Sequence, residues 1–130
     1  MRLSFLLENS GTSAAVSAFR RTGGGGRIVN VAARHAIEPR GGANMTAYTA
    51  TKGGLAALTQ ALAEEVAKDG VLVNAVAPSI MDTAANRKAM PKADHAAWPK
   101  VDEVAATVVF LASPDNRVTR GAVVPVYGKS

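Results

Sequence analysis

The sequence of 130 residues predicts an α/β fold, in which a parallel sheet is covered by helices on both faces. Segments with apolar residues at helical spacing alternate with short β-branched runs that are apolar almost without interruption. Such runs are typical of strands buried on both faces of a parallel sheet. Right-handed crossovers connect strands in this order. We therefore expect one domain, residues 1–130, with three layers.

Three runs are the predicted strands, at residues 27–32, 71–77 and 123–127. Pro78 ends the second run, and Pro125 lies inside the third. A proline within a strand favours the edge of a sheet or the end of a strand. Three strands make a narrow sheet, whose open edge is a liability unless something pairs with it.

Three segments have the spacing of amphipathic helices, at residues 6–21, 46–68 and 101–112. Four glycines at positions 23–26 end the first helix, and Asp69-Gly70 ends the second. Residues 38–44 are rich in Gly, Pro and Asn and predict a loop. Residues 79–100 predict an irregular excursion with one short helix near 83–90.

Composition argues against several classes of protein. The net charge is +5, but the cations are scattered in runs no longer than two, so we expect no nucleic-acid partner. Cysteine is absent, which excludes disulfides and fits a reducing compartment. Glu8 interrupts the only early apolar run, and no run reaches membrane-spanning length. We therefore expect a cytoplasmic protein. His35 and His95 have no second ligand at helical spacing, so we expect no metal site.

Tyr48 and Lys52 are the first candidates for chemistry. They lie four residues apart at the start of the second predicted helix, so both side chains should emerge on one face. An ammonium beside a phenol favours the phenolate and brings it toward the range in which proton transfer at neutral pH is efficient. The spacing alone is common by chance, and a half-buried Tyr beside a solvated Lys explains it equally well.

The context of this pair resembles the short-chain dehydrogenase/reductase family, in the family's order and at its spacings over essentially the whole chain. The second predicted strand and Pro78 are similar to the family's Asn-x-Val-x-Pro-Gly stretch. The matching segments are residues 30–33, 48–55, 73–78, 101–105, 109–114 and 121–128. The resemblance implies a partial Rossmann-like fold that corresponds to the carboxyl-terminal half of family members, without their amino-terminal βαβ units.

The resemblance also implies roles for individual residues. Tyr48 would be the general acid/base as a hydride moves to or from the nicotinamide of NAD or NADP. Lys52 would assist it and bind the nicotinamide ribose, and Thr83 would lie at the carboxamide. Asn9 falls about where the family holds a proton-relay water, although capping of a helix start by Asn9 or Ser10 is an equally good explanation. The backbone near three further residues would lie beside the nicotinamide, namely Pro78, Ser79 and Met81.

Two positions depart from the family pattern. Alignment on the first predicted strand puts Ala33 where the family usually has a Ser that donates to the substrate oxygen, and Ala33 cannot donate. Losing one such donor typically costs about a hundred- to a thousandfold in turnover. Counting back from Tyr48 gives His35 instead, and His35, Asn44 and Thr46 stay open as replacements. Ser79 stands where Gly is common, which indicates a slightly altered backbone path.

The family's glycine-rich phosphate turn and its Asn-Asn-Ala-Gly stretch do not occur in this sequence. The glycines at 23–26 follow a helix and precede a strand, the reverse of the required order. We therefore expect weak NAD(P) binding by this chain. Two interpretations stay open: an oxidoreductase acting on an alcohol or ketone, or an inactive remnant or half-protein that acts as an oligomerisation module. In both, the resemblance implies a homodimer or homotetramer formed through the helix that carries Tyr48.

Overall fold

The computed structural model describes residues 2–130, with side chains from residue 11 onward. Its centre is a parallel sheet in the order β1-β2-β3. The strands are β1 (Gly26–Val31), β2 (Val71–Pro78) and β3 (Val123–Val126). In the register, Val31 lies opposite Val76, and Val76 in turn lies opposite Val124. The α/β class and all three predicted strands are confirmed.

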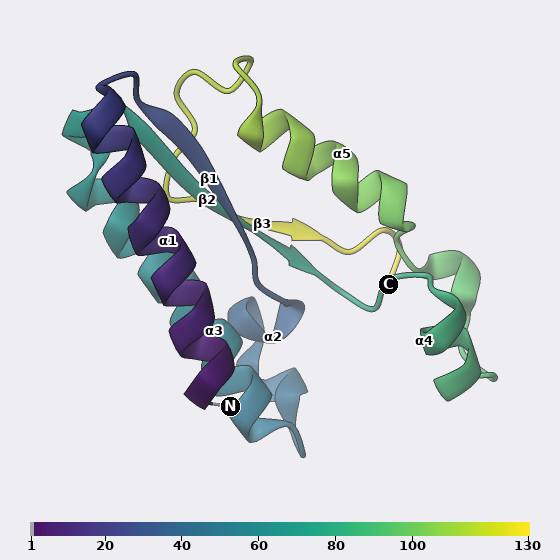
Figure 1. The fold of residues 1–130 in the computed structure, drawn as a ribbon. Coiled ribbons are helices and arrows are strands. Elements are labelled where there is room, and N and C mark those ends of the chain that lie inside the picture. Colours follow the sequence, from purple (N-terminus) through teal and green to yellow (C-terminus); the bar gives the residue numbers. More distant parts are fainter. Residues whose placement is uncertain (1) are drawn as a thin grey trace.

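Helices cover both faces of the sheet, as expected (Figure 1). α1 (Arg2–Thr22) and α3 (Thr46–Glu65) form one layer, and α5 (Val101–Ala112) lies on the opposite face against β1 and β2. α3 and α5 begin at the expected residues. The remaining helical elements are short: α2 (Arg34–Ile37), α4 (Ala84–Ala89) and three 3-10 turns at Pro39–Gly42, Ala67–Asp69 and His95–Ala97.

The core lies between the sheet and the layer formed by α1 and α3. Val71 and Val73 of β2 are fully buried against apolar side chains of both helices. At about 25 cal/mol per Å² of apolar surface removed from water, this burial is the main favourable term holding the two layers together. The other members of the cluster are Val16, Ala63 and Val66, with Phe19, Ile28 and Leu62 packed against them.

The expectation that the first strand is buried on both faces was wrong. β2 is buried along almost its whole length, but β1 is only partly buried and Val31 is 49% exposed. The reason is position, because β1 is an edge strand of the described sheet whereas β2 is central. β3 forms the other edge, which is where Pro125 was expected.

Several element boundaries also differ from the sequence prediction: α1 begins at Arg2 and not at residue 6, and β1 spans Gly26–Val31 and not residues 27–32. α3 ends at Glu65 and not at Lys68, because Val66 leaves helical geometry and turns the chain into a 3-10 turn that Gly70 ends at a φ of 71°. The expected loop at 38–44 contains the Pro39–Gly42 turn and follows α2 directly. The last two corrections concern short segments whose conformation depends on packing against the sheet.

Two buried asparagines fix the connection between α5 and β3. The side-chain amide of Asn116 donates to the carbonyl oxygens of Leu111 and Thr119, both at 3.1 Å, and its oxygen accepts from the Thr119 amide at 2.8 Å. Asn74 on β2 donates to the Thr119 carbonyl at 2.8 Å and accepts from the Ala122 amide at 3.0 Å. This network sets where β3 joins the sheet.

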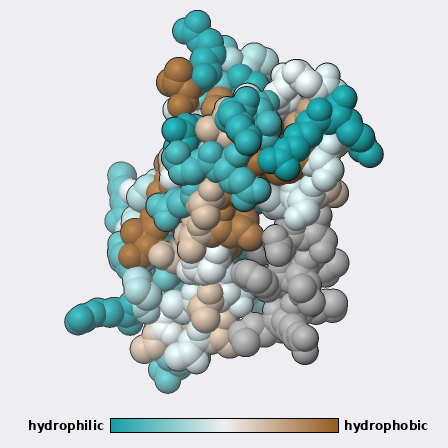
Figure 2. All heavy atoms as spheres, turned by 90° about the vertical axis from the view of Figure 1, so that its left-hand side faces the viewer, coloured by the Kyte–Doolittle hydropathy of each residue, from teal (hydrophilic) through white to brown (hydrophobic). Residues whose placement is uncertain are grey.

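The layer formed by α1 and α3 also has an outer surface, seen in Figure 2. On this face apolar side chains gather in patches across the middle, below a mostly hydrophilic upper part. A groove of about 450 Å³ runs between the two helices and includes Val16, Leu58 and Leu62, with Arg20 and Glu65 beside them.

Candidate active site

A cleft of about 670 Å³ opens at the carboxyl ends of β1 and β2. Residues 33–35, Met45 and Tyr48 contribute to its wall, as do residues 78–81 and Met90. In open parallel sheets the carboxyl ends of the strands are where ligands bind, because loops of variable sequence meet there. Of the residues predicted from sequence, Tyr48, Pro78, Ser79 and Met81 line this cleft, whereas Lys52 and Thr83 lie outside its wall.

Tyr48 and Lys52 emerge on the same face of α3. The Lys52 Nζ lies 6.0 Å from the centre of the Tyr48 ring and donates a hydrogen bond to the Val31 carbonyl oxygen at 2.8 Å. Val31 is the last residue of β1, so this bond ties the first turns of α3 to the end of that strand. The positive charge of Lys52 is therefore held on the Tyr48 side of the helix.

The environment of Tyr48 includes the histidine named from sequence. The His35 ring meets the Tyr48 ring edge to face, with centroids 5.9 Å apart and an interplanar angle of 80°. The His35 Nδ1 is buried and has no hydrogen-bond partner within residues 11–130. Ala33 is buried at the end of β1, and its methyl group offers no donor. Asn44 is exposed at a φ of 67°, away from the wall of the cleft.

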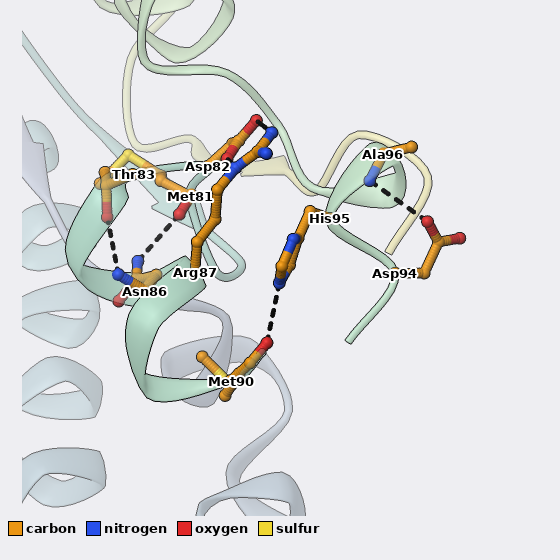
Figure 3. A network of polar contacts seen from close by, with 9 residues as sticks. All are labelled: Met81, Asp82, Thr83, Asn86, Arg87, Met90, Asp94, His95 and Ala96. Atoms are coloured by element: carbon orange, nitrogen blue, oxygen red, sulfur yellow. Dashed lines mark hydrogen bonds and ion pairs between the residues drawn. The ribbon is translucent and has the colours of Figure 1, made fainter. Parts of the chain in front are cut away.

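The segment beside the cleft is held by its own polar contacts (Figure 3). The Thr83 Oγ1 caps α4 by accepting from the Asn86 amide nitrogen at 3.2 Å, and the Asn86 side chain donates to the Met81 carbonyl oxygen at 2.8 Å. The Ser79 hydroxyl donates to the Tyr127 carbonyl oxygen at 3.1 Å. Thr83 keeps its own hydroxyl hydrogen for another acceptor.

The excursion at 79–100 is better ordered than its sequence predicts. Arg87 forms a two-point ion pair with Asp82, with Nε–Oδ1 at 2.5 Å and Nη2–Oδ2 at 2.8 Å, and it lowers the pKa of Asp82. The His95 Nε2 donates to the Met90 carbonyl oxygen at 2.7 Å, because a carbonyl can only accept (Figure 3). Trp98 is buried against His95 and does not line the cleft.

Arg34 and Tyr127 form a second contact near the mouth of the cleft. The Arg34 guanidinium carbon lies 4.7 Å from the centre of the Tyr127 ring, and its Nε donates to Glu38 at 2.8 Å. The Tyr127 hydroxyl is buried without a hydrogen-bond partner in the described part of the chain, and burial raises its pKa. Sequence reasoning missed Arg34, because no motif marks it.

The prediction for Asn9 concerns a side chain outside the described residues. Its backbone lies inside α1, which begins at Arg2. The alternative that Asn9 or Ser10 caps the start of this helix was therefore wrong, because the helix starts seven residues before Asn9. The proton-relay role implied by the resemblance stays a prediction.

Comparison with known proteins identifies the family. A family model described as enoyl-(acyl carrier protein) reductase matches residues 9–128. The chain belongs to the short-chain dehydrogenase/reductase family. It is 38% identical over 112 residues to the 3-oxoacyl-(acyl-carrier-protein) reductase FabG of Pseudomonas aeruginosa, and this match covers 79% of this chain and 44% of the relative. It is 33% identical to the 2-dehydro-3-deoxy-D-gluconate 5-dehydrogenase of Bacillus subtilis, over 81% of this chain and 44% of the relative.

Solved structures of the short-chain dehydrogenase/reductase family share the fold. An acetoin dehydrogenase from Enterobacter cloacae matches with a TM-score of 0.79 and 34% identity, over 90% of this chain and 48% of that one. A protein described as a 2-deoxy-D-gluconate 3-dehydrogenase from Agrobacterium tumefaciens, solved with bound NADP, matches with a TM-score of 0.80 and 33% identity, over 90% and 51%. The chain spans about half the length of the relatives it matches.

The described residues offer neither a membrane-spanning helix nor a metal cluster. No helix among them is both long and apolar enough to cross a membrane. Within the same residues no three or more His, Asp or Glu side chains come together as a metal site would require.

Proposed function

We propose that the chain carries the proton-transfer part of an NAD(P)-dependent oxidoreductase site that interconverts an alcohol and a carbonyl compound. One observation carries the proposal. Tyr48 lines the cleft without a hydrogen-bond partner for its hydroxyl in residues 11–130, and Lys52, tied to the end of β1, stands 6.0 Å from its ring. A weak acid free to reach a ligand, with a fixed positive charge beside it, is the arrangement that general acid/base catalysis requires.

In this mechanism the Tyr48 hydroxyl donates its proton to the carbonyl oxygen during reduction and takes a proton from the alcohol during oxidation. The Lys52 ammonium stabilises the negative charge that develops on the Tyr48 oxygen as the proton leaves. The nicotinamide, when bound, supplies or accepts the hydride.

The residues beside the cleft fit the nicotinamide end of such a cofactor. Pro78, Ser79 and Met81 lie on the same wall as Tyr48, and the Thr83 hydroxyl has a hydrogen available because its oxygen already accepts from Asn86. The Thr83 hydroxyl and the backbone near Pro78, Ser79 and Met81 would hold the carboxamide, and Lys52 would reach the ribose. Relatives solved with NADP support a nicotinamide cofactor, and the choice between NAD and NADP stays open.

The test replaces each tyrosine of the full chain by phenylalanine. Oxidation of NADH and NADPH is followed in the presence of a panel of ketones, with the reverse reaction on the matching alcohols. Tyr48→Phe should lower kcat/KM by about a hundred- to ten-thousandfold. Tyr127→Phe removes a phenolic hydroxyl outside the cleft wall and is the matched control, expected to stay within a few fold of wild type. Equal activity of the two variants would refute the proposal.

A second candidate is a non-catalytic half-protein that acts through assembly, as a homodimer or homotetramer or with a separate amino-terminal chain. Ala33 favours it, because the cleft lacks the usual hydroxyl donor at that position, and so does the edge position of β1. Small residues on α3 allow close helix approach, and Ala57 and Ala61 are exposed. Absence of turnover in wild type, together with an oligomer in sedimentation that Ala61→Glu dissociates, would favour this candidate.

A further inference from the structure

Most polar groups on the wall of the cleft are already paired within the protein. The Asn86 amide donates to the Met81 carbonyl oxygen at 2.8 Å. The Ser79 hydroxyl donates to a backbone carbonyl at 3.1 Å, and the charge of Arg34 is matched by Glu38 at 2.8 Å. These contacts hold the three side chains in place, and each uses only part of the hydrogen-bonding capacity of its side chain, since Arg34 pairs through Nε and Asn86 through its amide nitrogen.

Two polar side chains on the wall are uncommitted, and they lie side by side. The Tyr48 hydroxyl and the buried His35 Nδ1 have no hydrogen-bond partner among residues 11–130, and the two rings are 5.9 Å apart. The two rings form a polar end of the cleft that suits one oxygen atom of a ligand.

The rest of the wall is apolar and partly open. Met45, Met81, Met90 and Ile80 line it, and the exposed fractions of Met45 and Ile80 are 44% and 41%. Exposed apolar side chains that gather at one hollow mark a binding surface. Methionine is suited to such a wall, because its unbranched, polarisable side chain adapts to the shape of an apolar ligand.

We propose that the cleft selects a ketone, or the matching secondary alcohol, whose one oxygen is attached to an apolar body, and that it rejects polyhydroxylated substrates. The inference rests on the proposed function for the reacting oxygen, which the Tyr48 hydroxyl would bind beside the His35 ring. Further hydroxyls on that body would lie without partners against the methionine and isoleucine side chains, and each unpaired buried hydroxyl lowers affinity by about tenfold or more. An aromatic or aliphatic body instead replaces water along the methionine wall.

The test uses the methionine methyl groups as reporters. The chain has four methionines, and three of them line the cleft. In the full chain labelled with methyl-13C methionine, acetophenone should shift the signals of Met45, Met81 and Met90 in a saturable way. Dihydroxyacetone should bind at least about tenfold more weakly. Absence of a saturable shift with acetophenone up to its solubility, or equal binding of the two ketones, would overturn the inference.

Two exchanges at Met45 separate apolar contact from shape. Met45 is exposed, so its replacement leaves the core intact. Met45→Leu should keep the affinity for acetophenone, and Met45→Gln should weaken it by about threefold or more, since a polar amide replaces an apolar contact. Val118→Gln, at an 83% exposed site outside the cleft, is the control and should change nothing.

The binding measurement needs neither nucleotide nor turnover, so its failure can be told apart from failure of the proposed function. Selective binding of acetophenone with equal activity of Tyr48→Phe and wild type would leave the ligand class standing and remove the catalytic role. Turnover that depends on Tyr48, together with equally tight binding of dihydroxyacetone and acetophenone, would support the catalytic role and overturn the ligand class.

Discussion

Replacement of Asn116 by alanine tests whether buried amides hold the sheet together. Asn116 is 1% exposed and makes three side-chain hydrogen bonds, two to carbonyl oxygens of Leu111 and Thr119 and one from the Thr119 amide. Alanine leaves the Leu111 carbonyl and the Thr119 amide unpaired in a buried place. At about 1 kcal/mol for each lost bond, plus the cost of the orphaned groups, Asn116→Ala should lower the free energy of unfolding by about 2–4 kcal/mol.

The assay is urea unfolding, followed by circular dichroism and by the fluorescence of Trp98. If the two unfolding curves coincide, a single transition is measured. Arg117→Ala is the control. Its position is exposed and next in the chain, so it should stay within about 0.5 kcal/mol of wild type. An Asn116→Ala protein as stable as this control would show that the network does not hold β3, and the reasoning would fail.

Three further predictions follow from single contacts. Gly42→Ala places a methyl group against the Thr49 hydroxyl and should lower the free energy of unfolding in urea by about 1–3 kcal/mol. The double variant Gly42→Ala/Thr49→Ala should recover most of this loss. Arg87 lowers the pKa of Asp82 below 3.8, so the ion pair stabilises the fold at neutral pH. The difference in free energy of unfolding between wild type and Arg87→Gln should therefore vanish as the pH falls through the lowered pKa. Burial raises the pKa of Tyr127 above 10.0, so the stability contributed by its neutral phenol is present below pH 10 and is lost as the pH rises through the raised pKa. The measurement is the absorbance of the phenolate against pH, with Tyr127→Phe to assign the signal. A Tyr127 signal that titrates at or below pH 10 would contradict the prediction.

The sequence predicts those parts of the fold that local pattern decides. β2 is an uninterrupted apolar run because both of its faces are covered, and its sequence shows this directly. Tyr48 and Lys52 share a face because four residues make about one helical turn. Their order among the other motifs was enough to indicate the family, since each segment occupies its expected place relative to the strands.

Long-range packing decides what the sequence could not predict. The exposure of Val31 depends on which strands flank β1, and no local pattern encodes that. The contact of His35 with Tyr48 depends on the path of the chain through α2 and the turn after it. Met45 was not recognised as part of the site, because a lone methionine ahead of a helix has no motif. Its place three residues before Tyr48 was the one signal in the sequence.

The register of β1 on β2 is the physical condition for the site. The Ala32 amide donates to the Val76 carbonyl oxygen at 2.8 Å, which fixes the end of β1 next to the end of β2. A slip of one residue would move the Val31 carbonyl by about 3.3 Å and turn its neighbours to the other face of the sheet. Lys52 would then lose its acceptor and Ala33 its place beside the cleft. The site therefore depends on the apolar packing of β2 and of the partly buried β1, because that packing makes other registers unfavourable.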